Sequence, residues 1–394
     1  MDKRIIALVA AATMGAVISV QAAEDNERND STGFHFTDIK VNPTTSVKNQ
    51  NKSGTCWSFS GVSFLEDEIL KKGGPETDLS EMFVVRQVYL DKADKYIRLG
   101  GMANFGPGGA VTDVPYVYSV YGAVPEDVYP GIEYGEDGHV HGELDAVLKA
   151  YLDAVNKQPN RRLSTAWKKG YEGILDAYLG KVPETFTVDG KTYTPKSYAQ
   201  SLGLDAGDYV AYTSFTHHPF NAPFKLEVAD NWLWEDYNNV PMNELKDIVD
   251  KAIDKGYTVV WAADVSEPGF KWRKGVALMP ADKDGADLEG TELSRWVALT
   301  PAERQKEKYN FDGPVDEITV TQEMRQEMFD RRETTDDQGM VIVGKAVDQN
   351  GKPYYKVKNS WGTDGHIYDG YFYVSEPYFL AKTLSILVNK DAVR

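Results

Sequence analysis

The sequence predicts an α+β fold, because helical patterns dominate its first half and strand patterns gather toward its end. Apolar residues recur every three or four positions up to about residue 180. Runs rich in β-branched and aromatic residues follow from residue 258 onward and are densest after residue 338. Of the 394 residues, 42 % are hydrophobic, which is ample for a core.

The first 22 residues have the features of a secretory signal peptide. Two basic residues near the start precede an apolar or small stretch at 5–20, and Ala22 ends a small-residue cleavage site. An apolar run of about 16 residues is short for a membrane span. We therefore expect an exported protein, periplasmic or extracellular, that keeps no membrane partner once residues 1–22 are removed. The polar residues 23–37 would form a flexible leader.

Helices are expected first along the folded part of the chain. Apolar spacing predicts an amphipathic helix over residues 56–72, ended by two glycines. Further helical patterns lie at about 78–97, 112–121, 143–156, 164–180, 243–255 and 321–332. Strand patterns lie at 184–194, 258–265, 339–347, 353–358, 370–374 and 382–388, with a hairpin turn at Gly351-Lys352.

Composition excludes several classes of function. The formal net charge of −17 argues against a nucleic-acid partner, because phosphates would be repelled. A glycine-rich loop at 100–109 is not followed by Gly-Lys-Ser/Thr, so it is not a phosphate-binding P-loop. No Gly-x-Ser-x-Gly segment is present, which disfavours a serine hydrolase. A single cysteine excludes a disulfide within the chain.

That single cysteine, Cys56, is the strongest candidate for chemistry. It opens the predicted helix, where unpaired N–H groups and the positive dipole end should lower a thiol pKa and favour the thiolate. Gln50, six residues earlier, carries an amide that could donate to a developing oxyanion. The competing interpretation is a buried cysteine without chemistry, since free Cys is among the most buried residue types. The upstream glutamine and the helix start favour a nucleophile.

Two segments carry a family resemblance. Gln-x5-Cys-Trp-Ser-Phe, ending at Phe59, resembles the active-site segment of papain-like cysteine peptidases, and Asn359-Ser360-Trp361-Gly362 resembles their Asn-Ser-Trp-Gly segment. The wide separation of the two and the segment 212–220 are similar to the bleomycin hydrolase and aminopeptidase C branch. The resemblance covers about residues 38–390. It implies a papain-like two-lobed fold, with a helical half, an antiparallel sheet half and large insertions at about 131–235 and 266–334.

The resemblance also implies residue roles. Cys56 would be the nucleophile, Gln50 the oxyanion-hole side chain and Asn359 the residue that orients the catalytic histidine. Trp361 would shield the hydrogen bond between that histidine and the asparagine.

Peptides are the partners that the resemblance implies. The backbone of Gly108 and Gly109 would pair with an extended peptide in the cleft between the two halves. No cofactor and no metal is expected. A homo-hexamer is expected by analogy with aminopeptidase C relatives.

One position departs from the family pattern. The catalytic histidine should lie about twenty residues before the asparagine, at the start of a strand, and Gln338 occupies that place. Glutamine can hydrogen-bond to a sulfur but cannot accept its proton. The sequence thus predicts a cysteine peptidase whose activity is in doubt; the alternative is an inactive pseudopeptidase that binds peptides. None of the six histidines fills the slot: His35, His139, His141, His217, His218 and His366.

Two histidine pairs are conceivable metal ligands, and neither is expected to hold a metal. His217 and His218 are adjacent, and adjacent residues on a strand point to opposite faces. His139 and His141 lie between glycines in a loop that we expect to be exposed, with no third ligand evident. His366 would replace the missing base only if its loop folded back to the thiol.

Overall fold

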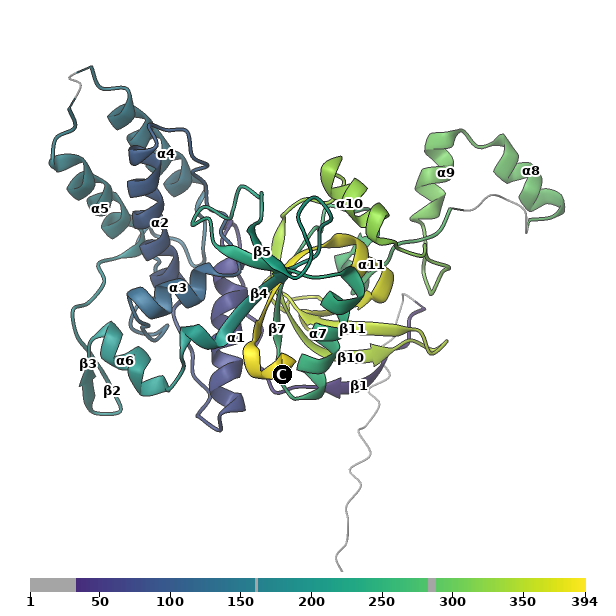
Figure 1. Ribbon diagram of the computed structural model, residues 1–394, viewed down its shortest axis with the longest axis horizontal. Helices are drawn as coiled ribbons and strands as arrows, with labels where there is room; N and C mark the ends of the chain where they lie inside the picture. The colour runs from purple at the N-terminus through teal and green to yellow at the C-terminus, as the bar shows by residue number, and fades with distance from the viewer. Residues whose placement is uncertain (1–32, 160–161, 283–287) are drawn as a thin grey trace, which may run out of the picture.

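The computed structural model describes residues 33–159, 162–282 and 288–394. The predicted signal peptide and the leader up to residue 32 lie outside the described residues. Within them the chain forms a helical half and a sheet half that meet along one helix, α1 (Figure 1). The predicted α+β class is confirmed.

The helical half is built from the first third of the chain and the segment that follows it. Its central helix begins at Cys56, as predicted, and its neighbours fall within a few residues of the expected boundaries. Helices α4 and α5 pack on each other and on α2, and a short hairpin precedes α6. The elements are α1 (Cys56–Lys71), α2 (Glu81–Arg98), α3 (Asp113–Val120), α4 (Gly142–Asn156), α5 (Ala166–Leu179), β2 (Phe186–Val188), β3 (Lys191–Tyr193) and α6 (Pro195–Leu202).

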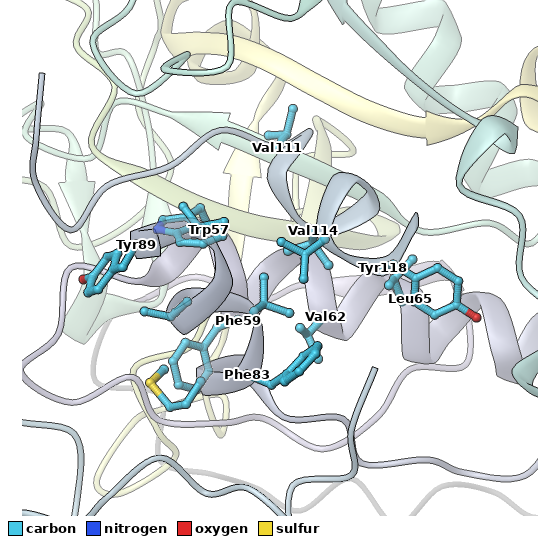
Figure 2. Close-up of a cluster of buried hydrophobic side chains, with 14 of the residues drawn as sticks. Trp57, Phe59, Val62, Leu65, Phe83, Tyr89, Val111, Val114 and Tyr118 are labelled. Atoms are coloured by element: carbon cyan, nitrogen blue, oxygen red, sulfur yellow. The ribbon is translucent and has the colours of Figure 1, made fainter. Parts of the chain in front are cut away.

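One hydrophobic core joins these helices. Figure 2 shows apolar side chains of α1 packed against those of α2 and α3. The apolar periodicity that predicted α1 is the face that enters this core. The side chains include Trp57, Phe59, Val62, Leu65, Phe83, Val114 and Tyr118, all 7 % exposed or less.

The sheet half contains eleven strands among the described residues, in the order β5-β6-β4-β13-β7-β10-β11-β12-β9-β8, with β1 paired to β10. Most neighbours are antiparallel; β4 with β6 and β12 with β9 are parallel. The strands are β1 (Thr37–Val41), β4 (Tyr209–Thr213), β5 (Ala222–Lys225), β6 (Asp236–Asn239), β7 (Val259–Ala263), β8 (Phe270–Lys271), β9 (Val276–Ala277), β10 (Gln338–Val347), β11 (Pro353–Lys358), β12 (Tyr371–Ser375) and β13 (Thr383–Asn389).

Helices cover this sheet and close its ends. Helix α7 (Met242–Asp254) packs on β1, β7 and β10, and α12 (Lys390–Val393) packs on α7. Helix α10 (Gln322–Asp330) packs on α11 (Glu376–Lys382). Helices α8 (Gly290–Ala298) and α9 (Pro301–Lys308) form an arm that projects from the body in Figure 1. Among the described residues, no helix combines the length and apolar character that a membrane span requires.

One sequence expectation needs correction. The leader was expected to stay flexible to residue 37, but Phe34 is fully buried against Phe311 and Phe36 stacks on Tyr373. Within the expected insertion at 131–235, β4 pairs with β13, so part of this segment belongs to the main sheet.

The two halves meet where β10 crosses the start of α1. Gly339, the second residue of β10, lies so close to this helix that a Cβ there would come within 2.7 Å of the Ser60 Oγ and 3.1 Å of the Trp57 Cα. A side chain at 339 would separate strand and helix. This close approach brings the first residue of β10, Gln338, to the helix start that carries Cys56.

Candidate active site

Cys56 is the first residue of α1, so the predicted helix N-terminus is confirmed. Its pKa does not follow the expectation: burial raises the pKa of the Cys56 thiol to about 12. Hydrogen bonds from the backbone N–H groups of Gly339 and Trp57 lower that pKa, while the carboxylates of Asp336 and Asp230 raise it further. The expected lowering was wrong because the cost of burying a thiolate exceeds the stabilisation that a helix end supplies.

Gln338 lies at the centre of a buried amide network. Its Nε2 donates one hydrogen bond to the Gln50 Oε1 at 3.0 Å and one to the Asn359 Oδ1 at 2.9 Å. The Ser360 hydroxyl also donates to the Gln50 Oε1, at 2.7 Å. The structure thus brings together three residues that the sequence singled out, and Ser360 completes the set. Ser360 was missed as a separate residue, although it belongs to the Asn-Ser-Trp-Gly segment.

The loop before Cys56 is held by its own hydrogen bonds. Gln50 Nε2 donates to the Ser53 carbonyl at 2.9 Å, and the Ser53 hydroxyl donates to the Gln50 carbonyl at 2.8 Å. The backbone N–H of Gln50 donates to the Ser360 carbonyl at 2.8 Å. One amide hydrogen of Gln50 is therefore engaged within the loop, and one remains for an oxyanion.

Asn359 follows the end of β11 directly. Its Oδ1 accepts from the Gln338 amide and from the Ser360 backbone N–H at 2.9 Å. Its Nδ2 is buried and has no hydrogen-bond partner in the part of the chain that the structure describes. An asparagine carbonyl placed in this way would equally accept an N–H from an imidazole at position 338. Its role as the residue that orients its neighbour therefore has a geometric basis.

Gly108 and Gly109 lie on the helical side of the site. Gly109 is so close to the Trp57 ring that a Cβ would come within 2.6 Å of it, and the Trp57 Nε1 donates to the Pro107 carbonyl at 2.9 Å. A Cβ at Gly108 would meet the Asp230 carboxylate at 2.1 Å. The backbone strip formed by Gly108 and Gly109 therefore lies beside the helix start that carries Cys56, and the Asp230 carboxylate lies against Gly108.

Part of this strip is already engaged inside the protein. The buried ammonium group of Lys92 donates to the carbonyls of Gly106 and Gly108. Because the Gly108 carbonyl already accepts from Lys92, fewer backbone groups of this strip are left to hydrogen-bond to a peptide. Sequence patterns gave no signal for Lys92, which lies within a helix, or for Asp230, which comes from a distant segment.

Trp361 belongs to an aromatic cluster. Its ring lies edge-on to Trp272 at 5.0 Å and to Phe270 at 5.9 Å, and its backbone forms a bridge with Asn49. This bridge fixes the end of the loop that precedes Gln50.

Two acidic residues precede the glutamine. Asp337 accepts from the backbone N–H groups of Val265 and Ser266, so it is a charge that holds the end of a strand. Asp336 is half-buried, and burial, Asp230 and Asp337 raise its pKa to about 8. Asp336 also acts on the thiol, which the sequence did not indicate.

His366 does not supply the missing base. Its Nε2 bonds to the Trp272 carbonyl at 2.8 Å, and its Nδ1 accepts from the backbone N–H of Gly370 at 3.2 Å. The ring stacks on Trp272 at 3.9 Å. Both ring nitrogens are engaged at a second location, so the loop does not offer a proton acceptor to the thiol.

The His217–His218 pair is closer to a metal site than expected. The two residues follow β4 in a turn rather than lying on a strand, and both Nε2 atoms reach the carboxylate of Glu227, at 3.0 and 2.8 Å. The expectation that they point to opposite faces was wrong. Within the described ranges, these three side chains form the group of potential ligands whose atoms lie close enough together to hold a metal ion.

Hydrogen bonding around His217 nevertheless opposes a metal. Gln326 accepts from the Thr216 backbone N–H through its Oε1, and its Nε2 donates to Asp330 at 2.9 Å and to the His217 Nδ1 at 3.0 Å. His217 Nδ1 is therefore an acceptor, and its proton is on Nε2, which donates to Glu227. A metal-binding Nε2 must be free of its proton, with Nδ1–H facing an acceptor.

Comparisons with known proteins agree with the fold. Residues 34–93 match the papain family cysteine protease model, and residues 290–394 match the Peptidase C1-like family. Aminopeptidase C of Streptococcus thermophilus is 22% identical over 390 residues, covering 88% of this chain and 80% of that protein. Aminopeptidase C of Listeria monocytogenes is 23% identical over 388 residues, with the same coverage of 88% and 80%.

A solved structure shows the same architecture. The crystal structure of PepW from Lactobacillus rhamnosis matches with a TM-score of 0.67 at 20% identity, covering 91% of this chain and 83% of that chain. The first family match contains Cys56, and the second contains Gln338 and Asn359. The resemblance seen in the sequence is thereby confirmed: two segments match papain-type family models, and the chain is similar to aminopeptidases C over most of its length.

Proposed function

We propose that this protein is a pseudopeptidase, which binds peptides in a papain-like cleft and hydrolyses them slowly or not at all. One observation carries the proposal: the Gln338 amide occupies the position of the base and donates to both Gln50 and Asn359. The neighbours of a catalytic histidine are in place around a side chain that has no basic nitrogen.

The chemistry of the site follows from this substitution. A cysteine peptidase needs a base to hold the thiolate and an acid to protonate the leaving amine. Cys56 has a raised pKa and only backbone donors, so near neutral pH it stays a thiol. Loss of one member of a catalytic triad in a serine protease costs roughly 10⁴ to 10⁶ in rate. We expect a loss of this order here.

Peptide binding depends on other groups. Gly109 borders the cysteine through Trp57, and the Lys92 side chain that holds Gly108 also lines a pocket of about 330 Å³. This pocket is bordered by Trp232 and by the exposed Trp234. The pocket wall combines these aromatic residues with Lys95 and Lys225, which suits a peptide that carries both apolar and acidic groups.

The alternative is a working exported cysteine peptidase with aminopeptidase activity. The names of the curated relatives favour it, since aminopeptidases C, G and W are among them. The features of residues 1–22 support export to the periplasm or the outside of the cell for either function.

The test compares wild type with Gln338→His and Gln338→Asn on fluorogenic aminoacyl and peptidyl substrates. We expect peptide binding by all three and hydrolysis by Gln338→His alone, with a gain of at least about 100-fold, the lower range that a general base supplies. Gln338→Asn keeps an amide and controls for the change in shape.

Hydrolysis by the wild type that is abolished in Cys56→Ser would establish the alternative. A folded Gln338→His variant with no gain in rate would show that the residues around 338 do not form a latent triad.

A further inference from the structure

Residues 138–141 hold the loop that precedes Cys56. The backbone N–H of Lys52 donates to the His139 carbonyl at 2.9 Å, and the backbone N–H of His141 donates to the Lys52 carbonyl at 3.1 Å. Lys52 lies between Gln50 and Cys56 in the sequence. This two-stranded bridge is therefore a direct restraint on the candidate active-site loop.

The two histidine rings anchor this segment in the core, contrary to the exposed loop expected from the sequence. His139 is 7 % exposed and His141 is 0 % exposed. The His139 ring lies edge-on to Phe59 at 5.6 Å and to His141 at 5.8 Å. Among the described residues, the buried His139 Nδ1 and both buried ring nitrogens of His141 have no hydrogen-bond partner.

The surroundings oppose a positive charge on these rings. Burial lowers the pKa of both histidines to about 4, and the charge of each ring would oppose that of the other. His141 is also the N-cap of α4, and the positive end of a helix dipole disfavours a cation there. Neutral rings are therefore a condition for the packed segment.

The titratable groups that face this pair leave it uncompensated. Tyr134, edge-on to His141 at 6.3 Å, accepts from the backbone N–H of Val140 through its hydroxyl. On the first turn of α4, Glu143 accepts from Tyr178, and Asp145 accepts from Tyr89 at 3.3 Å. The Lys52 side chain is exposed and adds only positive charge. On α1, Phe59 presents an apolar ring.

We propose that residues 138–141 form an acid-sensitive latch on the loop 50–56. Near neutral pH the neutral rings pack and the bridge to Lys52 is closed. Protonation of either ring in acid expels it from the core, breaks the bridge and frees the loop, while the sheet half stays folded. The site around Cys56 then opens reversibly with pH, whatever reaction or binding it serves.

Because Cys56 is the only cysteine of the chain, its reaction with 4,4′-dithiodipyridine reports opening of the loop directly. We expect the rate, corrected with glutathione for the reagent's own pH dependence, to rise at least about tenfold between pH 7 and pH 4.5, as local opening exposes the thiol. Far-UV circular dichroism should stay unchanged over this range. Return to pH 7 should restore the slow rate.

His141→Phe supplies the decisive comparison. Phenylalanine keeps an aromatic ring, does not titrate and removes no hydrogen bond, because both ring nitrogens of His141 are unpartnered. The variant should show a clearly smaller acid rise than the wild type, because only His139 can still be protonated, whereas His35→Gln, at an exposed position, should open like the wild type. Should His141→Phe fail to fold, amide hydrogen exchange of Lys52 against that of β10 in the wild type tests the same opening.

Three results would overturn the latch: a corrected rate that does not rise in acid, an equal rise in His141→Phe, or loss of secondary structure together with the rise. In the exchange experiment, the corresponding result is a Lys52 amide that opens only together with β10.

Discussion

In the proposed pseudopeptidase, Gln338 stands in place of the family's catalytic histidine and carries no basic nitrogen. Its amide satisfies the oxygens of Gln50 and Asn359, so no buried acceptor is left unpaired by the exchange. The papain-like fold can therefore be stable without a base at position 338, because the surrounding hydrogen-bond acceptors keep their donors.

The thiol of Cys56 should titrate only in strongly alkaline solution. Burial raises its pKa to about 12, so the rate of alkylation by iodoacetamide should still be climbing at pH 10. In Gln338→His, an imidazolium beside the sulfur should stabilise the thiolate and move the inflection into the neutral range. The measurement is the pH profile of alkylation; an inflection below pH 8 in the wild type would contradict the raised pKa.

Gly339 sets the distance between β10 and α1. Gly339→Ala places a Cβ within 2.7 Å of the Ser60 Oγ, and we expect it to cost about 1–3 kcal/mol through overpacking. The strand shift should also separate Gln338 from its partners. Urea unfolding measures the loss in the free energy of unfolding. Gly351→Ala, in the hairpin turn, is the comparison, because a Cβ there meets no neighbouring atom and is disfavoured only by the positive φ. Equal losses would mean that the contact with α1 does not matter.

At the scale of elements, Arg325 fixes α10 to α11 and to the end of β4. Its guanidinium is buried and donates to the carbonyls of Ser214 at 2.8 Å, Leu380 at 2.7 Å and Thr383. Burial lowers its pKa to about 9, so it remains charged at neutral pH. It supplies hydrogen bonds to carbonyls at the C-terminal end of α11, where a cation is favoured.

Replacement of this residue should be severe. Arg325→Leu leaves three buried carbonyls without their donor, and we expect a loss of about 3 kcal/mol or more in the free energy of unfolding. Arg331→Leu, at the exposed C-cap of the same helix, should change it by less than about 0.5 kcal/mol. The two are compared by urea unfolding, and similar losses would remove the structural role assigned to Arg325.

Across the whole molecule, buried acidic groups make stability depend on pH. Burial raises the pKa of Glu66 and Glu68 to about 7 and that of Glu126 to about 8. A carboxyl whose folded pKa lies above its unfolded value stabilises the protein fully in acid, and this contribution is lost as pH rises through the folded pKa. The two buried histidines act in the opposite sense, below about pH 6.5.

We therefore expect the melting temperature to fall between pH 6.5 and pH 9. Glu66 accepts from Thr45 and from the Leu79 backbone N–H, and a glutamine can keep the latter bond without a charge. Glu66→Gln should flatten the decline, and Glu76→Gln, at an exposed position, should leave it unchanged. A calorimetric scan series over pH that shows no decline in the wild type would contradict the assignment.

Local patterns in the sequence were enough for the main helices and for the candidate site positions. The apolar residues from Phe59 onward recur with helical spacing and predicted α1 to within a residue, although packing of the sheet buries this helix on its other faces as well. The short motifs around Gln50, Cys56 and Asn359 indicated residues that the fold brings together. The position of Gln338 followed from spacing along the chain, and β10 begins at that residue.

The tertiary structure decided the chemistry at these positions. A helix start lowers a thiol pKa only if its stabilisation exceeds the cost of desolvating the thiolate, and packing of β10 onto α1 desolvates the Cys56 sulfur although the residue stays partly exposed. The contacts of Asp230 with Gly108 and of Asp336 with Cys56 join segments more than a hundred residues apart, which no local pattern records. Residue identity along the chain thus determined which groups are present, while their burial and their partners, which set the pKa values and the hydrogen bonds, arise only when distant segments pack together.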